Sequence, residues 1–328
     1  MRLFRHFTEV PPAFRGAVIA LGNFEGMHLG HQAVIGEAVK VARQKGVAAA
    51  VMTFEPHPRM FFKPDQEPFR LSPFRIKARM IEALGVDYLY VLTFDREFSQ
   101  RSADNFVDEI LVEGLGVSQV VVGFDYVFGR GRGGNVDVLR AKAAERGFGV
   151  TAVTERRDGE GPRYSSSNIR AFLKEGRCLD AARLLGRYWE IAGRVEHGDQ
   201  RGRVMGFPTA NLPHGDYLHP KRGVYAVRAG IDRGAETDWH DAIANFGYRP
   251  TFDKKDLLLE VHLFDFKEDL YQSHLRVALI DYIRPEMKFD GLAAIKAQIA
   301  NDCDVARARL THLGVAPGKA PFVPVVPT

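Results

Sequence analysis

The amino-acid sequence predicts two domains of different fold class: an N-terminal α/β domain built on a parallel sheet, and a small antiparallel β-rich domain that ends in a helix. The chain has 328 residues, about twice the usual length of one domain. In its first half, short apolar runs alternate with segments of helical spacing, which is typical of right-handed βαβ units. After about residue 185, β-rich runs separated by Gly, Pro and Asp replace this alternation, which favours a small barrel or sandwich.

Five apolar runs in the first half predict the strands of the parallel sheet. Helices are expected between them, one over residues 29–45 and others that begin at Ser72-Pro73, at Ser102 and at Asn135. Ser and Asn are favoured N-cap residues, and Pro is favoured at the first helical position. The strands are expected at residues 17–21, 47–54, 86–93, 117–122 and 150–154.

The second half is predicted to begin with two short helices, at residues 168–176 and 179–186, and to end with a helix over residues 291–313. The β-rich runs between them show no sustained helical period; they are residues 189–197, 223–231, 239–246, 257–266 and 275–283. The final segment carries four prolines and is expected to be extended or disordered. The chain is therefore divided into domains at residues 1–186 and 187–314 and a tail at residues 315–328.

Composition excludes several classes of protein. Hydrophobic residues make up 45% and charged residues 26%, which are ordinary globular values. The N-terminal segment lacks the apolar run of a signal peptide, and no stretch approaches the roughly 18 apolar residues of a membrane span. Cys178 and Cys303 are too few for a disulfide scaffold, so free buried thiols and a reducing compartment, the cytoplasm, are expected. The net charge of +4 forms no basic stripe, which argues against binding of nucleic acid.

The first candidate site is the segment GNFEGMHLGH, residues 22–31, which joins the first predicted strand to the first predicted helix. Its glycines allow the backbone to approach a ligand closely, and the helix directs its N-terminal amides and the positive end of its dipole to the same place. His28 and His31 are three positions apart on the first helical turn, so both can face one anion. We name this segment the histidine loop. It has neither the glycine spacing of a dinucleotide-binding loop nor the Lys of a P-loop.

Two other interpretations of the histidine loop stay open at this point. The two histidines could simply be exposed at a helix start. They could also bind zinc with His57 as a third ligand, although no Cys or carboxylate has a convincing spacing.

The histidine loop resembles the H-x-G-H loop of the nucleotidylyltransferase superfamily and, together with Gln32, is similar to the loop of bacterial FAD synthetases. Three later segments resemble motifs of that family in the same order: TFEPHPR at residues 53–59, GFDYVFGRGRGG at 123–134 and SSSNIR at 165–170. The resemblance implies a Rossmann-like nucleotidylyltransferase domain that transfers the adenylyl group of ATP to FMN.

The resemblance also implies roles for individual residues. His28 and His31 would donate hydrogen bonds to the phosphoryl oxygens, where charge develops during the transfer. Ser166 and Ser167, beside a helix start, would hold the β- and γ-phosphates. The other expected nucleotide-binding residues are Gly22, Asn23, Phe24, Gly30, Asp125, Arg163 and Arg170.

Two features of this half need separate interpretation. Glu25 stands where the family usually has Asp, which lengthens the side chain by one methylene; we expect the surrounding loop to compensate. The stretch GRGRGG could instead contact RNA or form a plain flexible loop, although a single copy in a folded domain argues against RNA.

The second half carries GDQRGRVMGFPTAN at residues 198–211, which closely resembles a motif of riboflavin kinases. Further segments match that kinase module in order and spacing, at residues 245–252, 260–266, 269–271 and 284–289. The resemblance implies that Glu260 is the base for the ribityl alcohol and that Thr209 and Asn211 supply oxygen ligands to Mg²⁺. The nucleotide phosphates would be bound by Gly198, Arg201, Gly202 and Arg203, and the flavin by Gly206, Phe207, Pro208, Arg284, Glu286 and Phe289.

Structural interpretations of these residues stay open as well. Glu260 alternates with apolar neighbours, so it could be an outward-facing strand carboxylate. Residues 208–211 could form only a turn before a strand. Asp265 and Asp269 could be turn residues, and Phe207 and Phe289 could belong to the core.

Together the two resemblances imply a bifunctional riboflavin kinase/FAD synthetase of bacterial type. It would phosphorylate riboflavin to FMN and then adenylylate FMN to FAD with release of pyrophosphate, using ATP and Mg²⁺ in both steps. Its partners would be riboflavin, FMN, FAD and ATP, with no nucleic acid and no membrane; the oligomeric state is left open. The alternatives are a relative with one impaired activity, a flavin-binding or flavin-sensing protein without turnover, and a nucleic-acid-binding protein.

Overall fold

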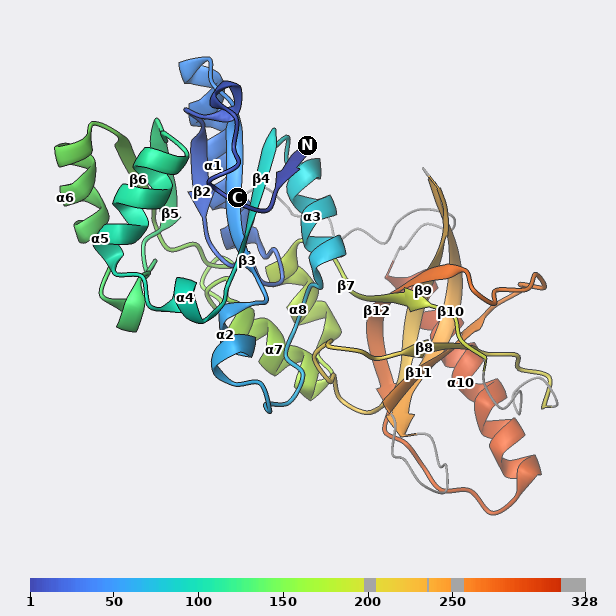
Figure 1. The fold of residues 1–328 in the computed structure, drawn as a ribbon. Coiled ribbons are helices and arrows are strands. Elements are labelled where there is room, and N and C mark those ends of the chain that lie inside the picture. Colours follow the sequence, from blue (N-terminus) through green and yellow to red (C-terminus); the bar gives the residue numbers. More distant parts are fainter. Residues whose placement is uncertain (198–204, 235, 249–256, 314–328) are drawn as a thin grey trace. The chain divides into compact units, whose positions relative to one another are not determined.

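The computed structural model describes residues 1–197, 205–234, 236–248 and 257–313 (Figure 1). Its contacts divide the chain into two compact units. The first unit consists of residues 1–67 and 72–164, and the second of residues 68–71 and the chain from residue 165 onward. Each unit has its own sheet, and each is described by itself.

The first unit contains a six-stranded parallel sheet with the order β1-β4-β3-β2-β5-β6. The chain adds β3 and β4 on one side of β2 and then β5 and β6 on the other, so the strand order reverses beside β2. This is the Rossmann-like arrangement that the sequence predicts. The strands are β1 (Arg2–Phe4), β2 (Val18–Leu21), β3 (Ala49–Glu55), β4 (Tyr88–Thr93), β5 (Gln119–Gly123) and β6 (Gly149–Val153). The short edge strand β1 is not among the predicted strands.

Helices cover both faces of this sheet. Because strand side chains alternate, Val18 and Ala20 of β2 face α1 (Leu29–Lys45) and α3 (Phe74–Ala83), whereas Ile19 and Leu21 face the opposite layer. That layer contains the π-helix η2 (Phe106–Gly114) and α6 (Val136–Arg146). The remaining short helices are η1 (Pro12–Phe14), α2 (Pro58–Phe62), α4 (Arg96–Ser99), α5 (Ala103–Asn105) and η3 (Arg130–Arg132).

In the first unit, the predicted helix starts at residue 29, at Ser102 and at Asn135 are confirmed, whereas the start at Ser72 is not. Ser102 accepts a hydrogen bond from the Asn105 amide, and Asn135 accepts from two amides of the first turn of α6. The expectation that Ser72 caps a helix with Pro73 inside it is wrong by one residue. Pro73 is the cap of α3 and makes no side-chain hydrogen bond, while the Ser72 amide donates to Glu25 instead.

The second unit contains a curled antiparallel sheet with the order β7-β12-β9-β10-β11-β8. A bridge between Glu196, beyond β7, and Asn211 of β8 joins the two edges, which confirms the predicted small barrel. The strands are β7 (Trp189–Arg194), β8 (Ala210–Pro213), β9 (Gly223–Arg233), β10 (Glu236–Tyr248), β11 (Leu257–Leu263) and β12 (His274–Arg284). They are preceded by α7 (Ser166–Glu175) and α8 (Cys178–Leu185) and followed by α10 (Leu292–His312).

The terminal helix α10 covers one face of the barrel. Cys303, Ala306 and Leu310 of α10 pack with Val224 of β9 and Ile243 of β10. Cys178 and Cys303 are both free and buried, as expected, and burial raises the pKa of the Cys178 thiol to about 12.

A short segment from the first half of the sequence belongs to the second unit. Residues 68–71 lie beside Tyr217: the Leu218 amide donates to the Arg70 carbonyl at 2.8 Å, and the Trp189 indole donates to the Leu71 carbonyl at 2.8 Å. Arg170 of α7 donates to the Phe69 carbonyl at 2.8 Å. The second unit therefore needs this piece of the N-terminal half of the chain.

His214 is a buried histidine of the second unit, 4% exposed, packed against the rings of His219 and Phe246. Burial, with a smaller contribution from the positive charge of His219, lowers its pKa to about 4. Unfolding releases the ring to its usual pKa near 6.5. Between pH 6.5 and pH 4 the unfolded state therefore binds more protons than the folded state, so His214 lowers the stability as the pH falls through this window.

We predict that acidification from pH 7.5 to pH 5.0 destabilises the second unit by about 2 kcal/mol through His214 alone. Both tryptophans of the chain, Trp189 and Trp239, lie in this unit, so tryptophan fluorescence during urea unfolding reports on it selectively. The variant His214→Gln cannot titrate in this window, and its loss of stability between the two pH values should be smaller by that amount. An equal loss in both proteins would contradict the prediction.

Candidate active sites

The histidine loop follows the carboxyl end of β2, a central strand beside which the strand order of the sheet reverses. His28 caps α1, because its Nδ1 accepts a hydrogen bond from the His31 amide at 3.2 Å. A ring nitrogen that accepts carries no proton, so the proton of the neutral His28 ring lies on Nε2. The two imidazole rings stack with centroids 3.6 Å apart and planes inclined by 20°. The loop thus holds two imidazoles together at the N-terminus of a 17-residue helix, which favours an anionic ligand.

The backbone of the histidine loop is held in an unusual conformation. Phe24 and Met27 have φ values of 48° and 50°, which non-glycine residues rarely adopt, and both side chains are buried in the core. A Cβ on Gly30 would lie 3.1 Å from His28 Nδ1, so glycine leaves room for the imidazole. Phe24 also contacts the His31 ring edge-on at 5.4 Å. Phe24 therefore acts on this site as a packing residue.

A second group of expected site residues follows β5, the neighbour of β2. Asp125 comes directly after this strand, and its Oδ2 lies 3.3 Å from a guanidinium nitrogen of Arg163. The carboxyl ends of neighbouring parallel strands lie on the same side of a sheet, so Asp125 and the histidine loop both follow the carboxyl ends of adjacent strands. The stretch after Asp125 is ordered: Phe128 and Gly134 form a β-bridge that closes the GRGRGG loop, which argues against a plain flexible loop.

Ser166, Ser167 and Arg170 lie on α7, in the second unit. The cap of α7 is Ser165, which accepts from the Asn168 amide at 3.2 Å, so Ser166 and Ser167 occupy the first helical turn. Their position at a helix N-terminus agrees with a phosphate-binding role.

An aromatic cluster, which the sequence interpretation misses, extends from the carboxyl end of β3. The Phe61, Phe62 and Phe94 rings contact one another with centroids 5.2–5.7 Å apart, and the Phe62 ring is 63% exposed. Phe54 and Phe98 continue the cluster inward. The aromatic pairs at residues 61–62 and 94–98 were the available signal, but they have no characteristic spacing.

In the second unit, the expected kinase residues line one cavity of about 440 Å³ between the sheet, the segment after β12 and α10. Thr209, Asn211 and Glu260 lie on its sheet side. The expected flavin residues that line it are Phe207, Arg284, Glu286 and Phe289. We name this the larger cavity. Ile295 and Ile299 of α10 supply an apolar wall.

A row of three polar side chains crosses the floor of the larger cavity. Glu260 of β11 is paired directly with Asn211 of β8 on one side and with Asn245 of β10 on the other. Directly paired residues point to the same face of a sheet, with Cβ atoms about 5 Å apart. The carboxylate is therefore flanked by two amides inside the cavity, which excludes the interpretation of Glu260 as an ordinary outward-facing strand residue.

Arg284 is held at the edge of the larger cavity by Asp302 of α10. Its Nε lies 3.0 Å from both Asp302 oxygens, and a terminal guanidinium nitrogen lies 2.6 Å from Oδ2. Asp302 is only 3% exposed, so the pair is shielded from water and its geometry is well defined. The sequence places Asn245 in a matched segment but gives it no role, and it offers no prediction for Asp302. An acidic residue within the buried stripe of α10, next to Cys303, was the signal for Asp302.

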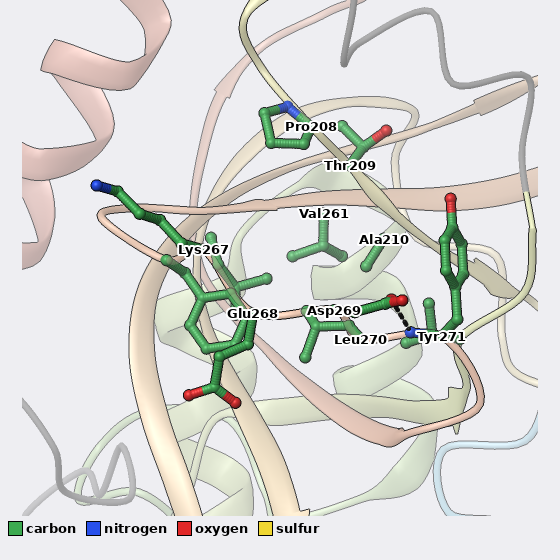
Figure 2. Close-up of a pocket in the computed structure, with 12 residues that line it drawn as sticks. Pro208, Thr209, Ala210, Val261, Lys267, Glu268, Asp269, Leu270 and Tyr271 are labelled. Atoms are coloured by element: carbon green, nitrogen blue, oxygen red, sulfur yellow. Dashed lines mark hydrogen bonds between the residues drawn. The ribbon is translucent and has the colours of Figure 1, made fainter.

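A smaller cavity of about 380 Å³ lies between β8, β11 and the loop between β11 and β12 (Figure 2). Figure 2 shows Ala210 and Val261 inside it, Lys267 and Glu268 toward one end, and Tyr271 at the other. Thr209 lines both this cavity and the larger one.

The smaller cavity is bounded by residues with turn and packing roles. Pro208, an expected flavin residue, lines this cavity and not the larger one, and its carbonyl lies 2.8 Å from His262 Nδ1. Asp269 accepts from the Tyr271 amide, as expected of a turn residue. Asp265 pairs with Arg307 of α10, which lowers the pKa of the Asp265 carboxyl.

The remaining site predictions have more limited support from the geometry. Gly198, Arg201, Gly202 and Arg203 lie outside the described residues, as do residues 249–252 and the tail 315–328. Gly206 has a φ of 90° and immediately precedes Phe207 of the larger cavity. Within the described ranges no group of three or more His, Cys, Asp or Glu side chains could hold a metal ion. His57 Nδ1 caps α2 by accepting from the Arg59 amide.

Thr209 and Asn211 nevertheless fit a magnesium ion. They present a hydroxyl and an amide oxygen, and oxygen atoms are the ligands that Mg²⁺ prefers. Mg²⁺ is usually held by one or two protein groups, with water and substrate phosphates completing its shell, so a larger protein cluster is not needed. No helix in the described part of the chain has the length and apolarity needed to cross a membrane.

Comparison with known proteins defines the class of both units. Residues 10–168 match the family model of FAD synthetase, and residues 185–310 match that of riboflavin kinase. The chain therefore combines a nucleotidyltransferase module and a flavokinase module.

The same two-module organisation occurs in its relatives. The chain is 42% identical to the bifunctional riboflavin kinase/FMN adenylyltransferase of Listeria monocytogenes, with 90% of this chain and 93% of that protein covered. It is 40% identical to the protein of the same name from Escherichia coli, with 94% and 97% covered. The chain belongs to the family of bifunctional riboflavin kinase/FMN adenylyltransferases.

A solved structure agrees with this assignment of the fold. A crystal structure from Streptococcus pneumoniae, described as a macrolide-efflux protein, matches with a TM-score of 0.81 and 31% identity, covering 93% of this chain and 98% of that one.

We predict that Gly247→Ala weakens the binding of riboflavin. A Cβ on Gly247 would lie 2.0 Å from Glu286 Oε1 and 2.6 Å from its Cδ, so the carboxylate must move within the larger cavity. A displacement that costs about 1–3 kcal/mol raises the KM for riboflavin roughly 5-fold to 150-fold. Gly193→Ala on β7 is the matched control, because its Cβ would make only ordinary contacts of 3.8 Å or more. An unchanged KM in Gly247→Ala would show that Glu286 does not contact the flavin.

Proposed function

We propose that the β-rich domain phosphorylates riboflavin to FMN and that the N-terminal α/β domain joins FMN to the adenylyl group of ATP, giving FAD and pyrophosphate. The observation that carries the proposal is the row of Asn211, Glu260 and Asn245 on the floor of a cavity large enough for a tricyclic ring. We assign the kinase to residues 187–314 and the adenylyltransferase to residues 1–186. Because both cysteines are free, we place the enzyme in a reducing compartment, the cytoplasm.

In the kinase, Glu260 acts as the general base. It accepts the proton of the terminal ribityl hydroxyl as that oxygen attacks the γ-phosphorus of ATP, and the bond to the bridging oxygen of ADP breaks. Asn211 and Asn245 flank Glu260 on the two neighbouring strands. Mg²⁺, when bound by Thr209 and Asn211, neutralises charge on the phosphate oxygens.

The flavin ring takes the apolar part of the larger cavity. Phe207 and Phe289 provide aromatic surface, and Ile295 and Ile299 close the wall on α10. Arg284, fixed by Asp302, and Glu286 offer polar groups to the edge of the ring. This leaves the smaller cavity for ATP, because Thr209 lies on the boundary between the two cavities, where the phosphoryl group must pass. Gly198, Arg201, Gly202 and Arg203 would bind its phosphates.

In the adenylyltransferase, a phosphate oxygen of FMN attacks the α-phosphorus of ATP, and pyrophosphate leaves. The chemistry needs little more than charge stabilisation and positioning. The Nε2–H of His28, the ring of His31 and the N-terminus of α1 supply donors for the phosphate oxygens, beside the backbone of Gly22, Asn23 and Gly30. Arg163 would bind a further phosphate, and Asp125, which pairs with Arg163, would orient the nucleotide or the flavin.

The exposed aromatic cluster at Phe61, Phe62 and Phe94 is our candidate for the flavin-binding surface of the first unit. The isoalloxazine ring is flat and apolar, and aromatic side chains bind such rings by stacking and edge contacts. The cluster begins at the carboxyl end of β3, which is next to β2 in the sheet. It therefore lies on the same side of the sheet as the histidine loop, which follows the carboxyl end of β2.

We predict that Glu260→Gln lowers riboflavin phosphorylation by roughly 10²-fold to 10⁴-fold, because the amide cannot accept the proton. Adenylylation of supplied FMN by the same protein should continue at the normal rate. The assay follows riboflavin, FMN and FAD over time in the presence of ATP and Mg²⁺. Glu236→Gln, an exposed strand glutamate in the same barrel, is the control and should leave both rates unchanged. Loss of both activities in Glu260→Gln would indicate that Glu260 supports folding instead.

We predict that replacement of both His28 and His31 by Ala abolishes FAD formation, while FMN still accumulates from riboflavin. Removing one donor to developing phosphoryl charge typically costs about 10²-fold to 10³-fold, and this variant loses two. His6→Ala removes an exposed histidine of the same unit and should have no effect. FAD synthesis at a near-normal rate in the double variant would exclude the histidine loop as the phosphate site.

A further inference from the structure

Two ionisable side chains of the first unit are buried beside the histidine loop and have no part in the reaction described above. Glu25 lies within the loop and is 3% exposed, and the side chain of Lys77 on α3 is fully buried. Burying a charged group is costly unless it is paired and hydrogen-bonded, so such residues usually have a defined task. Both of them connect the loop to the same helix, α3.

Glu25 makes the first connection. Its Oε1 accepts a hydrogen bond from the Ser72 amide at 3.0 Å. Ser72 lies two residues before Phe74, where α3 begins, so the carboxylate is near the positive end of that helix. The loop is thereby attached to the start of α3 at a residue that directly follows the left-handed Phe24.

Lys77 makes the second connection, from the next turn of α3. Its Nζ lies 3.2 Å from Glu55 Oε1 and donates to Thr53 Oγ1 at 3.5 Å, both at the carboxyl end of β3. Thr53 Oγ1 in turn donates to the Asn23 carbonyl of the histidine loop at 3.2 Å. The chain Lys77–Thr53–Asn23 therefore reaches the loop at a point two residues before Glu25.

These two connections fix a segment that needs external support. Phe24 and Met27 have left-handed backbone conformations that cost free energy and persist only where the surroundings determine them. Asn23 is held from β3 and α3, and Glu25 is held from the start of α3. Because Asn23 and Glu25 are both held, the backbone between them and His28 has little conformational freedom.

We propose that Glu25 and Lys77 are positioning residues for adenylyl transfer, which together fix the histidine loop to α3 and thereby set the positions of His28 and His31. The proposal rests on the function proposed above for the loop. The length of the Glu25 side chain is part of the proposal. Aspartate at this position would withdraw the carboxylate by about one C–C bond, and a misplacement of about 1 Å in a catalytic group can cost on the order of 10²-fold in rate.

The test compares Glu25→Asp, Glu25→Gln and Lys77→Met in the full-length chain. We expect Glu25→Asp and Lys77→Met to lower kcat for FMN adenylylation by roughly 10-fold to 100-fold, with a smaller change in KM. Glu25→Gln keeps both the length and an Oε1 acceptor for the Ser72 amide, so it should retain most of the rate. Riboflavin phosphorylation by the same samples should be unchanged, which controls for general damage to the protein.

A second readout does not depend on activity. Long-range proton–nitrogen NMR of the histidine rings reports which ring nitrogen carries the proton. The His28 Nδ1 accepts from the His31 amide in the intact loop, so its ring should be the Nε2–H form. In Glu25→Asp and Lys77→Met this preference should weaken. If the unaltered protein fails to make FAD yet the variants still shift the tautomer, the proposed function fails, whereas the inference that Glu25 and Lys77 fix the histidine loop stands.

If Lys77→Met does not fold, Thr53→Val replaces it. This substitution nearly preserves the shape of the buried side chain and the Lys77–Glu55 pair, but it removes the hydroxyl that donates to Asn23. It should produce the same changes in smaller degree. A normal kcat and an unchanged His28 tautomer in Glu25→Asp, or in whichever of Lys77→Met and Thr53→Val is used, would overturn the proposal.

Discussion

The pairing of β2 between β3 and β5 is the constraint on which the first unit depends. After β2 the chain continues to α1 on one face of the sheet, and after β5 it continues to α6 on the other face. Neither connection therefore passes over the carboxyl ends of both strands. In sheets of this kind, ligands bind beyond the carboxyl ends of the two strands where the strand order reverses, and the loops that follow β2 and β5 lie there. The helices need only cover the two faces of the sheet, and the loops at this edge are available for chemistry.

The second unit places its polar groups by a different principle. Its site residues lie on the strands themselves, where cross-strand register places Glu260 between two amides without any flexible segment. A polar row on a covered sheet face would normally be unfavourable. Here α10 packs closely at Cys303, Ala306 and Leu310 but leaves space near Ile295 and Ile299, so the polar row faces a cavity and not a packed core. The same helix supplies Asp302, which holds Arg284. Packing and site geometry in this unit thus depend on one helix.

Local patterns predicted what local interactions decide. The helix over residues 29–45 was predicted with its observed bounds, because His28 caps its start and the left-handed Gly46 ends it. The motif residues of the kinase line one cavity because strand pairing fixes the face to which each side chain points. Features that depend on distant contacts were missed. They include β1, which is short and mostly exposed, the pairing of Arg70 with Tyr217, and the hydrogen bond from the Ser72 amide to Glu25. Asp302 was missed for the same reason, since its partner lies on another element.

The fact that residues 68–71 belong to the second unit has a consequence for synthesis on the ribosome. The chain grows from its N-terminus at about 5–20 residues per second, so Tyr217 follows this segment after roughly 10–30 s. During that interval α3 and the strands of the first unit can already assemble around a segment that has no pairing partner. Phe69 and Leu71 are 5% and 1% exposed in the finished protein, and until then the backbone between them lacks its partners at Tyr217 and Leu218. An apolar segment of this kind, exposed for a time during synthesis, is a site for chaperone binding and for aggregation.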